Sequence, residues 1–163
     1  MSQPGEWVLL AYRLPREPST PRVTAWRRLS RLGAVQLVDG LVGLPADART
    51  KEQLEWIADE VLEAGGEATI WVARPGSIQQ EQAIAQRMAD AIAAEYRSVA
   101  AVATDAMELG DGQSRRRTLG RLRRELRRVA ARDFFPPPER ESARIAVERL
   151  AATVDVDAAV VDR

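Results

Sequence analysis

The sequence feature that most constrains the fold is an Asp-Gly pair between two short apolar runs. Asp39-Gly40 is flanked by residues 34–38 on one side and by residues 41–44 on the other. An Asp-Gly pair in this position favours a two-residue turn, because both residues tolerate the positive φ angles that such a turn requires. The pattern therefore predicts a β-hairpin in which Leu37 faces Val42.

A strand and a helix precede this hairpin, and a second helix and a strand follow it. Residues 7–14 form a short apolar run that ends at a proline, which is typical of a buried strand. Helical spacing of apolar residues predicts helices over residues 20–32 and 50–64, each followed by glycine. Residues 68–73 are predicted as the fourth strand. The apolar stripes of the two helices comprise Val23, Trp26, Leu29, Leu32, Leu54, Ile57, Val61 and Leu62.

Hydroxyl side chains mark the starts of the predicted helices. Thr20 precedes Pro21, which suits an N-cap followed by proline at the first helical position. Residues 50–53 (TKEQ) have the spacing of a capping box, and residues 77–80 (SIQQ) repeat that spacing before a third helix. Each helix is therefore expected to begin at one of these hydroxyl residues.

The elements over residues 7–74 follow the order β-α-β-β-α-β, which is the order of the ferredoxin-like split βαβ fold. We therefore predict an α+β protein. Residues 1–76 are expected to form a ferredoxin-like βαββαβ sandwich, in which two helices cover one face of a four-stranded antiparallel sheet. Residues 77–163 are expected to form a C-terminal helical extension, packed on or beside this core in a single folding unit.

Three helices are predicted in the extension. The first covers about residues 77–108 and is interrupted by glycines at 110–112. The second covers residues 114–132, and a rigid Phe-Phe-Pro-Pro-Pro connector follows at 134–138. The third helix begins at the end of this connector and contains the apolar residues Ile145, Leu150 and Val154.

Two absences in the composition exclude several kinds of catalytic site. The chain has no cysteine and no histidine, which removes thiolate nucleophiles, cysteine metal sites and the usual general base near neutral pH. A carboxylate-only metal site would need closely spaced Asp and Glu residues with glycine in one loop, and the sequence shows no such loop. We therefore expect a protein that binds rather than catalyses, with no metal and no cofactor.

No segment has the properties of a membrane span or of a signal peptide. A membrane helix needs about 20 predominantly apolar residues, and residues 1–6 lack a basic run followed by an apolar one. The absence of cysteine fits a reducing compartment. We therefore expect a cytoplasmic protein that has no membrane partner.

Residues 114–132 contain the clearest candidate for a functional surface, because this segment holds nine arginines and one acid, Glu125. Projected at 100° per residue, leucines and a valine form one apolar stripe, and most arginines fall on the opposite side. Arginine binds phosphate oxygens well, and each neutralised phosphate releases counterions, so that binding weakens as salt is added. The apolar stripe consists of Leu119, Leu122, Leu126 and Val129. The phosphate backbone of DNA is therefore a candidate ligand of the opposite side. The arginines expected to contact it are Arg116, Arg117, Arg121, Arg123, Arg124, Arg127 and Arg128.

Two other interpretations explain the same arginine-rich helix. Residues 1–110 hold 11 Lys/Arg and 15 Asp/Glu, whereas residues 111–163 hold 13 and 9. The arginines could therefore pair with acids elsewhere in the chain or in another subunit. Basic amphipathic helices also lie on membrane surfaces, but this helix carries no Trp or Phe for that purpose.

The predicted helix over residues 20–32 presents three arginines on the side away from Trp26 and Leu29, and a fourth, Arg22, at its N-terminal edge. Such a face is commonly only solvated, but a helix with several arginines can also enter or flank a DNA groove. Base reading favours Asn, Gln, Ser or Thr beside the arginines, and Thr24 is the one such residue on this side. The further candidate DNA contacts are Arg22, Arg27, Arg28 and Arg31.

The chain contains four tryptophans, and core packing is the expected role of Trp7, Trp26 and Trp56. Trp71 alternates with its apolar neighbours along the fourth strand, so it is expected to face the open side of the sheet. In that position it can serve as a stacking platform or as a dimer contact.

Several short segments occur in an order and spacing that are fairly specific. They are WVLLAYRLP at 7–15, RVTAWRRLSRLG at 22–33, GLVGLP at 40–45, QLEW at 53–56, GGEA at 65–68, the arginine-rich helix and RDFF at 132–135. Together they resemble the N-terminal domain family of the chromate-resistance regulator ChrB. The likeness covers roughly residues 7–150.

This resemblance implies a bacterial, cytoplasmic regulator associated with chromate efflux operons. Members of the family are thought to bind operator DNA and to release it when chromate is present, so chromate is the effector that the resemblance implies. A full-length regulator carries a second, C-terminal chromate-resistance domain, and this chain is expected to end where that domain begins.

The leading hypothesis is a DNA-binding transcriptional regulator linked to chromate resistance. The alternative is a non-catalytic protein–protein interaction or dimerisation domain. Its partner would be a second copy of the chain or a sensor domain, and it should expose an apolar patch around Trp71. A third hypothesis is a metal-dependent phosphodiesterase, because the β-α-β-β-α-β order also resembles that of small CRISPR adaptation endonucleases. Those endonucleases carry an acid at the end of the first strand, where this chain has Arg13-Leu14-Pro15-Arg16, and this difference counts against nuclease activity.

Overall fold

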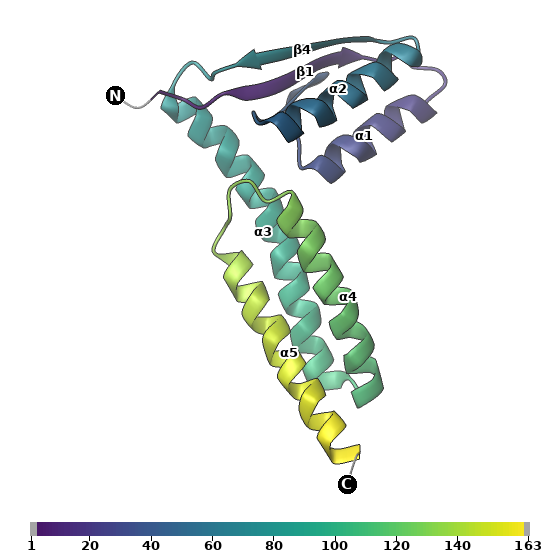
Figure 1. The fold of residues 1–163 in the computed structure, drawn as a ribbon, viewed down its shortest axis with the longest axis vertical. Coiled ribbons are helices and arrows are strands. Elements are labelled where there is room, and N and C mark those ends of the chain that lie inside the picture. The colour runs from purple at the N-terminus through teal and green to yellow at the C-terminus, as the bar shows by residue number, and fades with distance from the viewer. Residues whose placement is uncertain (1–2, 162–163) are drawn as a thin grey trace. The chain divides into compact units, whose positions relative to one another are not determined.

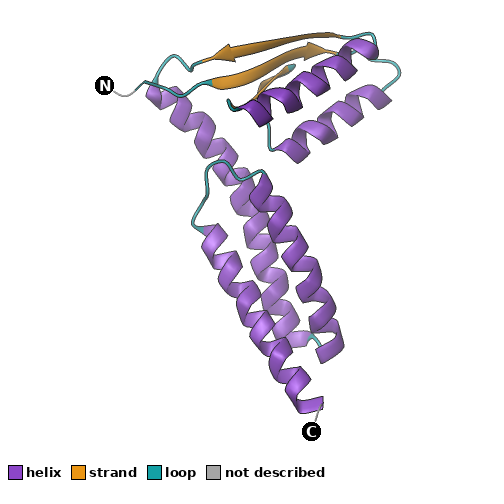
Figure 2. Cartoon of the chain, viewed as in Figure 1, coloured by secondary structure: helices purple, strands orange, loops and turns teal. Residues whose placement is uncertain are grey.

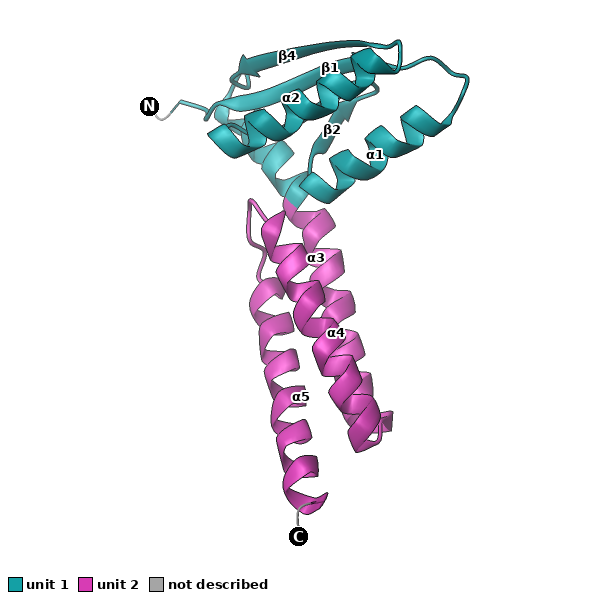
Figure 3. Ribbon diagram, turned by 45° about the vertical axis from the view of Figure 1, so that its right-hand side comes forward, with its two compact units in different colours: residues 1–88 teal, residues 89–163 magenta. Residues whose placement is uncertain are grey.

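The computed structural model describes residues 3–161. The chain divides into two compact units, residues 1–88 and residues 89–163 (Figure 3), and the boundary between them falls within one long helix. Over the described range the chain forms four strands and five helices. That the core and the helical extension fold as a single unit stays a prediction.

The first unit is a mixed α/β domain built on one antiparallel sheet. Its elements are β1 (Trp7–Arg13), α1 (Thr20–Leu32), β2 (Val35–Val38), β3 (Leu41–Pro45), α2 (Ala48–Glu63), β4 (Glu67–Ala73) and the N-terminal part of α3 (Ile78–Leu109). The strand order is β2-β3-β1-β4, and each neighbouring pair is antiparallel. Helices α1 and α2 lie on the same face of the sheet (Figure 1), and Figure 2 shows the strands as a layer beside these helices. The prediction of a four-stranded antiparallel sheet in a mixed α/β fold is confirmed.

The core of this unit lies between the sheet and the two helices. Val8 and Leu10 alternate along β1 and are fully buried. Their pairing partners on β3, Leu44 and Val42, share the same face of the sheet and are buried as well. Helix α2 adds Leu54, which has no exposed surface. Burial of each such side chain stabilises the fold by about 1.5–3 kcal/mol.

The hairpin forms at Asp39-Gly40, but its register differs from the prediction. Val42 pairs with Gln36 rather than with Leu37, because the register shifts at a bulge between Gln36 and Val38. A bulge adds one residue to one strand, and the alternation of apolar residues does not reveal it. The predicted pairing of Leu37 with Val42 was therefore wrong.

The apolar stripe predicted for α1 is partly wrong. Ala25 and Leu29 are its buried residues, whereas Trp26 keeps 63% of its surface exposed and Val23 is exposed as well. Successive residues of a helix point about 100° apart. Once Ala25 and Leu29 face the core, Trp26 is turned toward the edge of the helix.

The predicted burial of the apolar stripe of α2 and of the tryptophans is also partly wrong. Helix α2 buries Leu54, Ile57 and Val61 as expected, but Leu62 is exposed. Of the three tryptophans expected in the core, Trp7 is buried, whereas Trp26 and Trp56 are more than 60% exposed. Apolar character alone does not decide burial, because the packing of the whole helix sets which side faces the sheet.

Helix α2 begins earlier than predicted, because Asp47 rather than Thr50 is its N-cap. Asp47 Oδ1 accepts a hydrogen bond from the Thr50 backbone N–H at 2.7 Å, and the Thr50 hydroxyl accepts one from the Asp47 N–H at 3.0 Å. Thr50 therefore closes the capping box instead of opening it. The N-cap of α1 is Ser19, also earlier than predicted. The predicted start of α3 at Ser77 is confirmed, because Ser77 Oγ accepts a hydrogen bond from the Gln80 N–H at 3.2 Å, which is one of the two bonds of the predicted capping box.

The second unit is a helical bundle formed by the rest of α3, by α4 (Gly112–Ala131) and by α5 (Glu139–Val161), which lie side by side in Figure 3. The apolar stripe predicted for α4 is confirmed, since three of its four residues are buried and Leu126 packs against them. The core draws on all three helices and contains Ile92, Tyr96, Val99, Ala103, Leu119, Leu122, Val129, Ala143, Val147, Leu150 and Val154.

Candidate nucleic-acid interface

Helix α4 is positioned by its N-cap and by its apolar stripe. Asp111 Oδ1 accepts a hydrogen bond from the Ser114 backbone N–H at 2.7 Å. This contact satisfies a free amide of the first turn, and the negative charge of Asp111 suits the N-terminus of a helix. The apolar stripe packs in the core that α4 shares with α3 and α5, so most of the arginines of α4 point away from the bundle.

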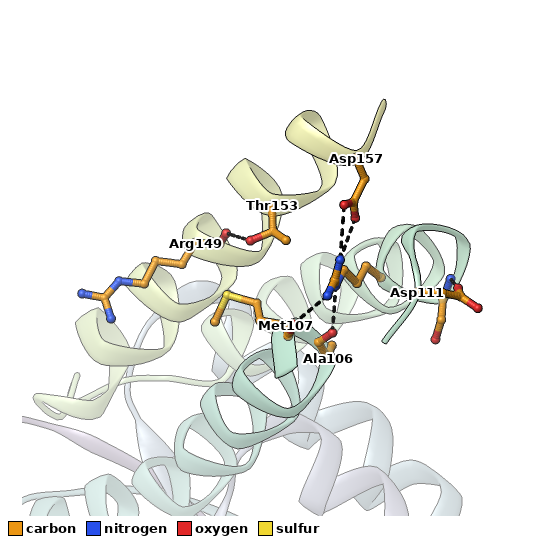
Figure 4. A network of polar contacts seen from close by, with 8 residues as sticks. Ala106, Met107, Asp111, Arg149, Thr153 and Asp157 are labelled. Carbon is orange, nitrogen blue, oxygen red and sulfur yellow. Dashed lines mark hydrogen bonds and ion pairs between the residues drawn. The ribbon is translucent and has the colours of Figure 1, made fainter. Parts of the chain in front are cut away.

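Arg115 is an exception, because its guanidinium joins three helices of the bundle. Its Nη1 donates hydrogen bonds to both carboxylate oxygens of Asp157 on α5, at 3.0 and 3.2 Å. Its Nε and Nη2 donate to the carbonyl oxygens of Ala106 and Met107 near the end of α3, at 3.2 and 2.8 Å. Figure 4 shows Asp157, Ala106 and Met107 converging in this network. Carbonyl groups at a helix C-terminus lack partners within the helix, so Arg115 stabilises the bundle itself.

A second group of polar contacts lies at the other end of α4. The guanidinium of Arg132 binds the carboxylate of Glu95 on α3, and this hydrogen bond raises the pKa of Arg132. The hydroxyl of Tyr96 donates to Asp133 Oδ2 at 2.8 Å. Burial, and then the hydrogen bond to Asp133, raise the pKa of Tyr96 to about 12. These contacts hold the end of α4 against α3.

The remaining arginines of α4 form an exposed cationic surface. Arg128 pairs with Glu125, one turn earlier in the same helix, at 3.1 Å. The others form no ion pair with any residue between 3 and 161. This surface is named the α4 arginine face and consists of Arg116, Arg117, Arg121, Arg123, Arg124, Arg127 and Arg128.

The spacing of these arginines suits a polyanion. Arg117, Arg121 and Arg124 are separated by four and three residues, so they lie in one row along the helix surface. A guanidinium presents a fork of N–H donors that matches the oxygens of a phosphate. A row of such groups at intervals of one helical turn can contact several phosphates of a nucleic-acid backbone together.

The candidate arginines of α1 lie in the first unit and are exposed as well. Arg28 forms an ion pair with Glu60 of α2. Arg22 Nη1 donates to the carbonyl oxygen of Arg16 at 3.4 Å. Arg22, Arg27 and Arg31 form no ion pair with any residue from 3 to 161. These arginines form a smaller group than the α4 arginine face, and half of them have a partner.

Neither a metal-binding cluster nor a membrane-spanning helix occurs between residues 3 and 161. No group of three or more acidic side chains in this range is arranged to hold a metal ion. No helix in this range is both long enough and apolar enough to cross a bilayer.

Arg13 and Arg16 were not predicted as binding residues, but the fold places them beside an open groove together with Arg22 and Trp26. Arg13 is the last residue of β1 and Arg16 lies in the loop after it, whereas Arg22 and Trp26 belong to α1. Spacing along the chain does not indicate that these four side chains meet. The one feature of the local sequence that points to this groove is the number of arginines between residues 13 and 31.

The fold and the site define an α/β domain that continues into a helical bundle with an exposed arginine face. The family model "Protein ChrB, N-terminal" matches residues 22–161, and the chain belongs to this family. The chain is also similar to Protein ChrB of Cupriavidus metallidurans, with 29% identity over 163 residues, which cover 92% of this chain and 47% of the relative. The chain thus spans about half the length of that curated relative. No solved structure matches the chain.

Proposed function

We propose that this chain is a non-catalytic regulatory domain linked to chromate resistance, and that it binds duplex DNA through the α4 arginine face. Membership of the ChrB N-terminal family supports the link to chromate resistance and a place in the cytoplasm, where a bacterial operator lies. DNA binding rests on one observation: seven arginines of α4 are exposed, and Arg128 alone among them has an ion-pair partner in the described part of the chain.

Electrostatics favour a phosphate backbone as the ligand of this face. Glu125 is the one acid in α4, so the positive charges of the helix are barely offset. Exposed arginines in such a row gain binding free energy from the release of counterions that are condensed on DNA. Phosphate contacts position a protein on DNA but do not read the sequence. The α1 arginines Arg22, Arg27, Arg28 and Arg31 are proposed as further contacts.

We also infer that the first unit is a ferredoxin-like split βαβ domain. Its elements follow the order β-α-β-β-α-β, and β1 lies between β3 and β4. The position of α1 and α2 on one face of the sheet supports the same assignment.

Replacing Arg117, Arg121 and Arg124 together by glutamine is expected to weaken duplex binding and to flatten its salt dependence. Each lost phosphate contact lowers the slope of log K against log salt by about 0.9, so the slope should fall by about 3. The measurement is fluorescence anisotropy of a labelled duplex from upstream of the chain's own operon, with a random duplex alongside. Both are titrated across a salt series, with and without chromate.

The matched control removes three arginines from other surfaces of the same bundle. Arg97, Arg144 and Arg149 are exposed, and the first two pair with acids. Their replacement by glutamine changes the net charge equally but should change the salt slope by less than about 1. Equal weakening by both triple variants would contradict a specific role of the α4 arginine face. If the wild-type chain binds no duplex at low salt, DNA binding itself is contradicted. If the chain prefers the operator duplex and chromate weakens this binding, the result supports a complete regulator.

A second candidate function is self-association through β4. This strand lies at the edge of the sheet and pairs with β1 alone in the described part of the chain. Trp71 is 57% exposed, and Val72 beside it is exposed as well. An open strand edge with large apolar side chains is a template for pairing with another strand. We propose a second copy of the chain as its partner.

Trp71→Thr is expected to convert a concentration-dependent dimer into a monomer. Threonine keeps a high preference for strands, so the sheet itself should persist. Sedimentation velocity over a range of protein concentrations measures the association, and Trp56→Gln, which removes an exposed tryptophan from α2, is the control. A wild-type chain that stays monomeric at the highest concentration would rule this function out.

A further inference from the structure

An open groove lies in the first unit between the end of β1, the hairpin turn and the start of α1. Its volume is about 600 Å³, which is in the usual range of small-ligand sites. It is named the Trp26 groove, and the side chains that determine its chemistry are Tyr12, Arg13, Arg16, Arg22, Trp26 and Asp39.

Backbone contacts hold one wall of the Trp26 groove in place. The Tyr12 N–H donates to the carbonyl oxygen of Gly40 at 2.8 Å. Gly40 has a φ of 75°, and a Cβ at this position would lie 2.6 Å from the Tyr12 carbonyl oxygen, so this close approach requires glycine. The side-chain amide of Gln36 donates to Asp39 Oδ1 at 3.1 Å. The wall is therefore formed before any ligand binds, which lowers the entropic cost of binding.

The groove has a net positive charge, because three arginines and one acid line it. Arg13 pairs with Glu67 at 3.0 Å. Arg22 donates to the backbone of Arg16 at 3.4 Å, which holds these two residues together. Neither of their guanidinium groups forms an ion pair with a residue in the range 3–161. Two neighbouring guanidinium groups without an acidic partner are a favourable donor set for phosphate oxygens.

Trp26 provides an aromatic surface beside these arginines. Its side chain is largely exposed, although large aromatic side chains are mostly buried in a core or at an interface. Trp26 follows Arg22 by four residues in α1, so the indole and the guanidinium lie on the same side of the helix. A planar ring can therefore stack on the indole while a phosphate attached to that ring reaches the arginines.

We propose that the Trp26 groove binds a nucleotide, with the base stacked on Trp26 and the phosphates bound by Arg16 and Arg22. An inorganic oxyanion would use the arginines and leave the indole without a role, whereas an apolar ligand would leave the arginines without one. A nucleotide carries both the planar ring and the charge that the groove accommodates. The inference does not depend on the α4 arginine face, because no residue of α4 lines the groove; Arg22 is the one residue that the two proposals share.

Isothermal titration calorimetry of the full chain tests this inference with ADP, GDP, CDP and UDP, and with pyrophosphate and adenosine as the two halves of a ligand. At least one of the nucleotides should bind at least about tenfold more tightly than pyrophosphate or adenosine alone. Arg16→Gln with Arg22→Gln should weaken that nucleotide about tenfold or more. Trp26→Leu should reduce the affinity for that nucleotide to the affinity for pyrophosphate. Trp26→Phe keeps an aromatic ring and should retain most of the nucleotide affinity.

The matched control is Arg27→Gln with Arg31→Gln, which removes the same charge from other exposed positions of α1 and should leave nucleotide affinity unchanged. Pyrophosphate that binds as tightly as the best nucleotide would overturn the inference, and so would equal losses of nucleotide affinity in the two double variants.

The triple variant of Arg117, Arg121 and Arg124 should bind the nucleotide normally. A wild-type chain that binds a nucleotide but no duplex would overturn the proposed function alone, and the reverse result would overturn this inference alone.

Discussion

Arg115→Met is expected to lower the stability of the helical bundle by about 2–3 kcal/mol. The side chain is 19% exposed, and its guanidinium donates to Asp157 and to the carbonyl oxygens of Ala106 and Met107. Methionine fills a similar volume but donates no hydrogen bond. The variant would therefore remove the guanidinium donor from the partly sheltered carboxylate of Asp157 and from the Met107 carbonyl oxygen, whereas the Ala106 carbonyl oxygen keeps its hydrogen bond from the Gly110 N–H at 3.1 Å.

Urea denaturation followed by far-ultraviolet circular dichroism measures this loss, because most of the helical signal comes from the bundle. The matched control is Arg116→Met, which changes the next residue of α4, an exposed arginine without an ion pair in the described range. Its effect should stay within about 0.5 kcal/mol. If both variants lose equal stability, the contacts of Arg115 contribute nothing beyond those of any arginine in this helix.

Tyr96→Phe is expected to destabilise the same bundle by about 1–3 kcal/mol. Tyr96 is buried and donates its hydroxyl hydrogen to Asp133 Oδ2. The other carboxylate oxygen of Asp133 is buried and has no hydrogen-bond partner among the described residues. Without the tyrosine hydroxyl, the nearest charged partner of this carboxylate is Arg140 at 3.9 Å. A double variant with Asp133→Ala should lose less than the sum of the two single changes, because each of them removes the same hydrogen bond.

The contribution of Tyr96 should also depend on pH. Burial, followed by the hydrogen bond to Asp133, raises the pKa of Tyr96 from 10.0 to about 12. A phenol with a higher pKa in the folded state keeps its proton more firmly there. Its contribution is therefore complete below about pH 10 and is lost as the pH rises through about 12. Denaturation midpoints measured from neutral to strongly alkaline pH should show this loss in the wild-type chain and much less of it in Tyr96→Phe. An identical alkaline loss in both proteins would exclude Tyr96 as its source.

The sequence by itself determined the type of most elements and the approximate positions of their ends. Asp39-Gly40 marks the hairpin, Gly33 ends α1, and the glycines at 110–112 separate α3 from α4. These signals are local, because a turn or a helix end depends on the backbone preferences of a few neighbouring residues. The stripe and the arginine side of α4 were predictable for the same reason, since their 3.6-residue period is regular over the whole helix.

Only the tertiary structure decided which of these side chains are free to bind. Arg115 and Arg116 are neighbours in sequence, yet the first turns inward because Asp157, 42 residues later, is packed beside it. Trp26 is as apolar as a core residue, but the packing of α1 on the sheet buries Ala25 and Leu29 and leaves the indole exposed. The loop after β1 brings Arg16 to the start of α1, which creates the Trp26 groove. Contacts between residues distant in the chain depend on how whole elements pack, and no local preference encodes them.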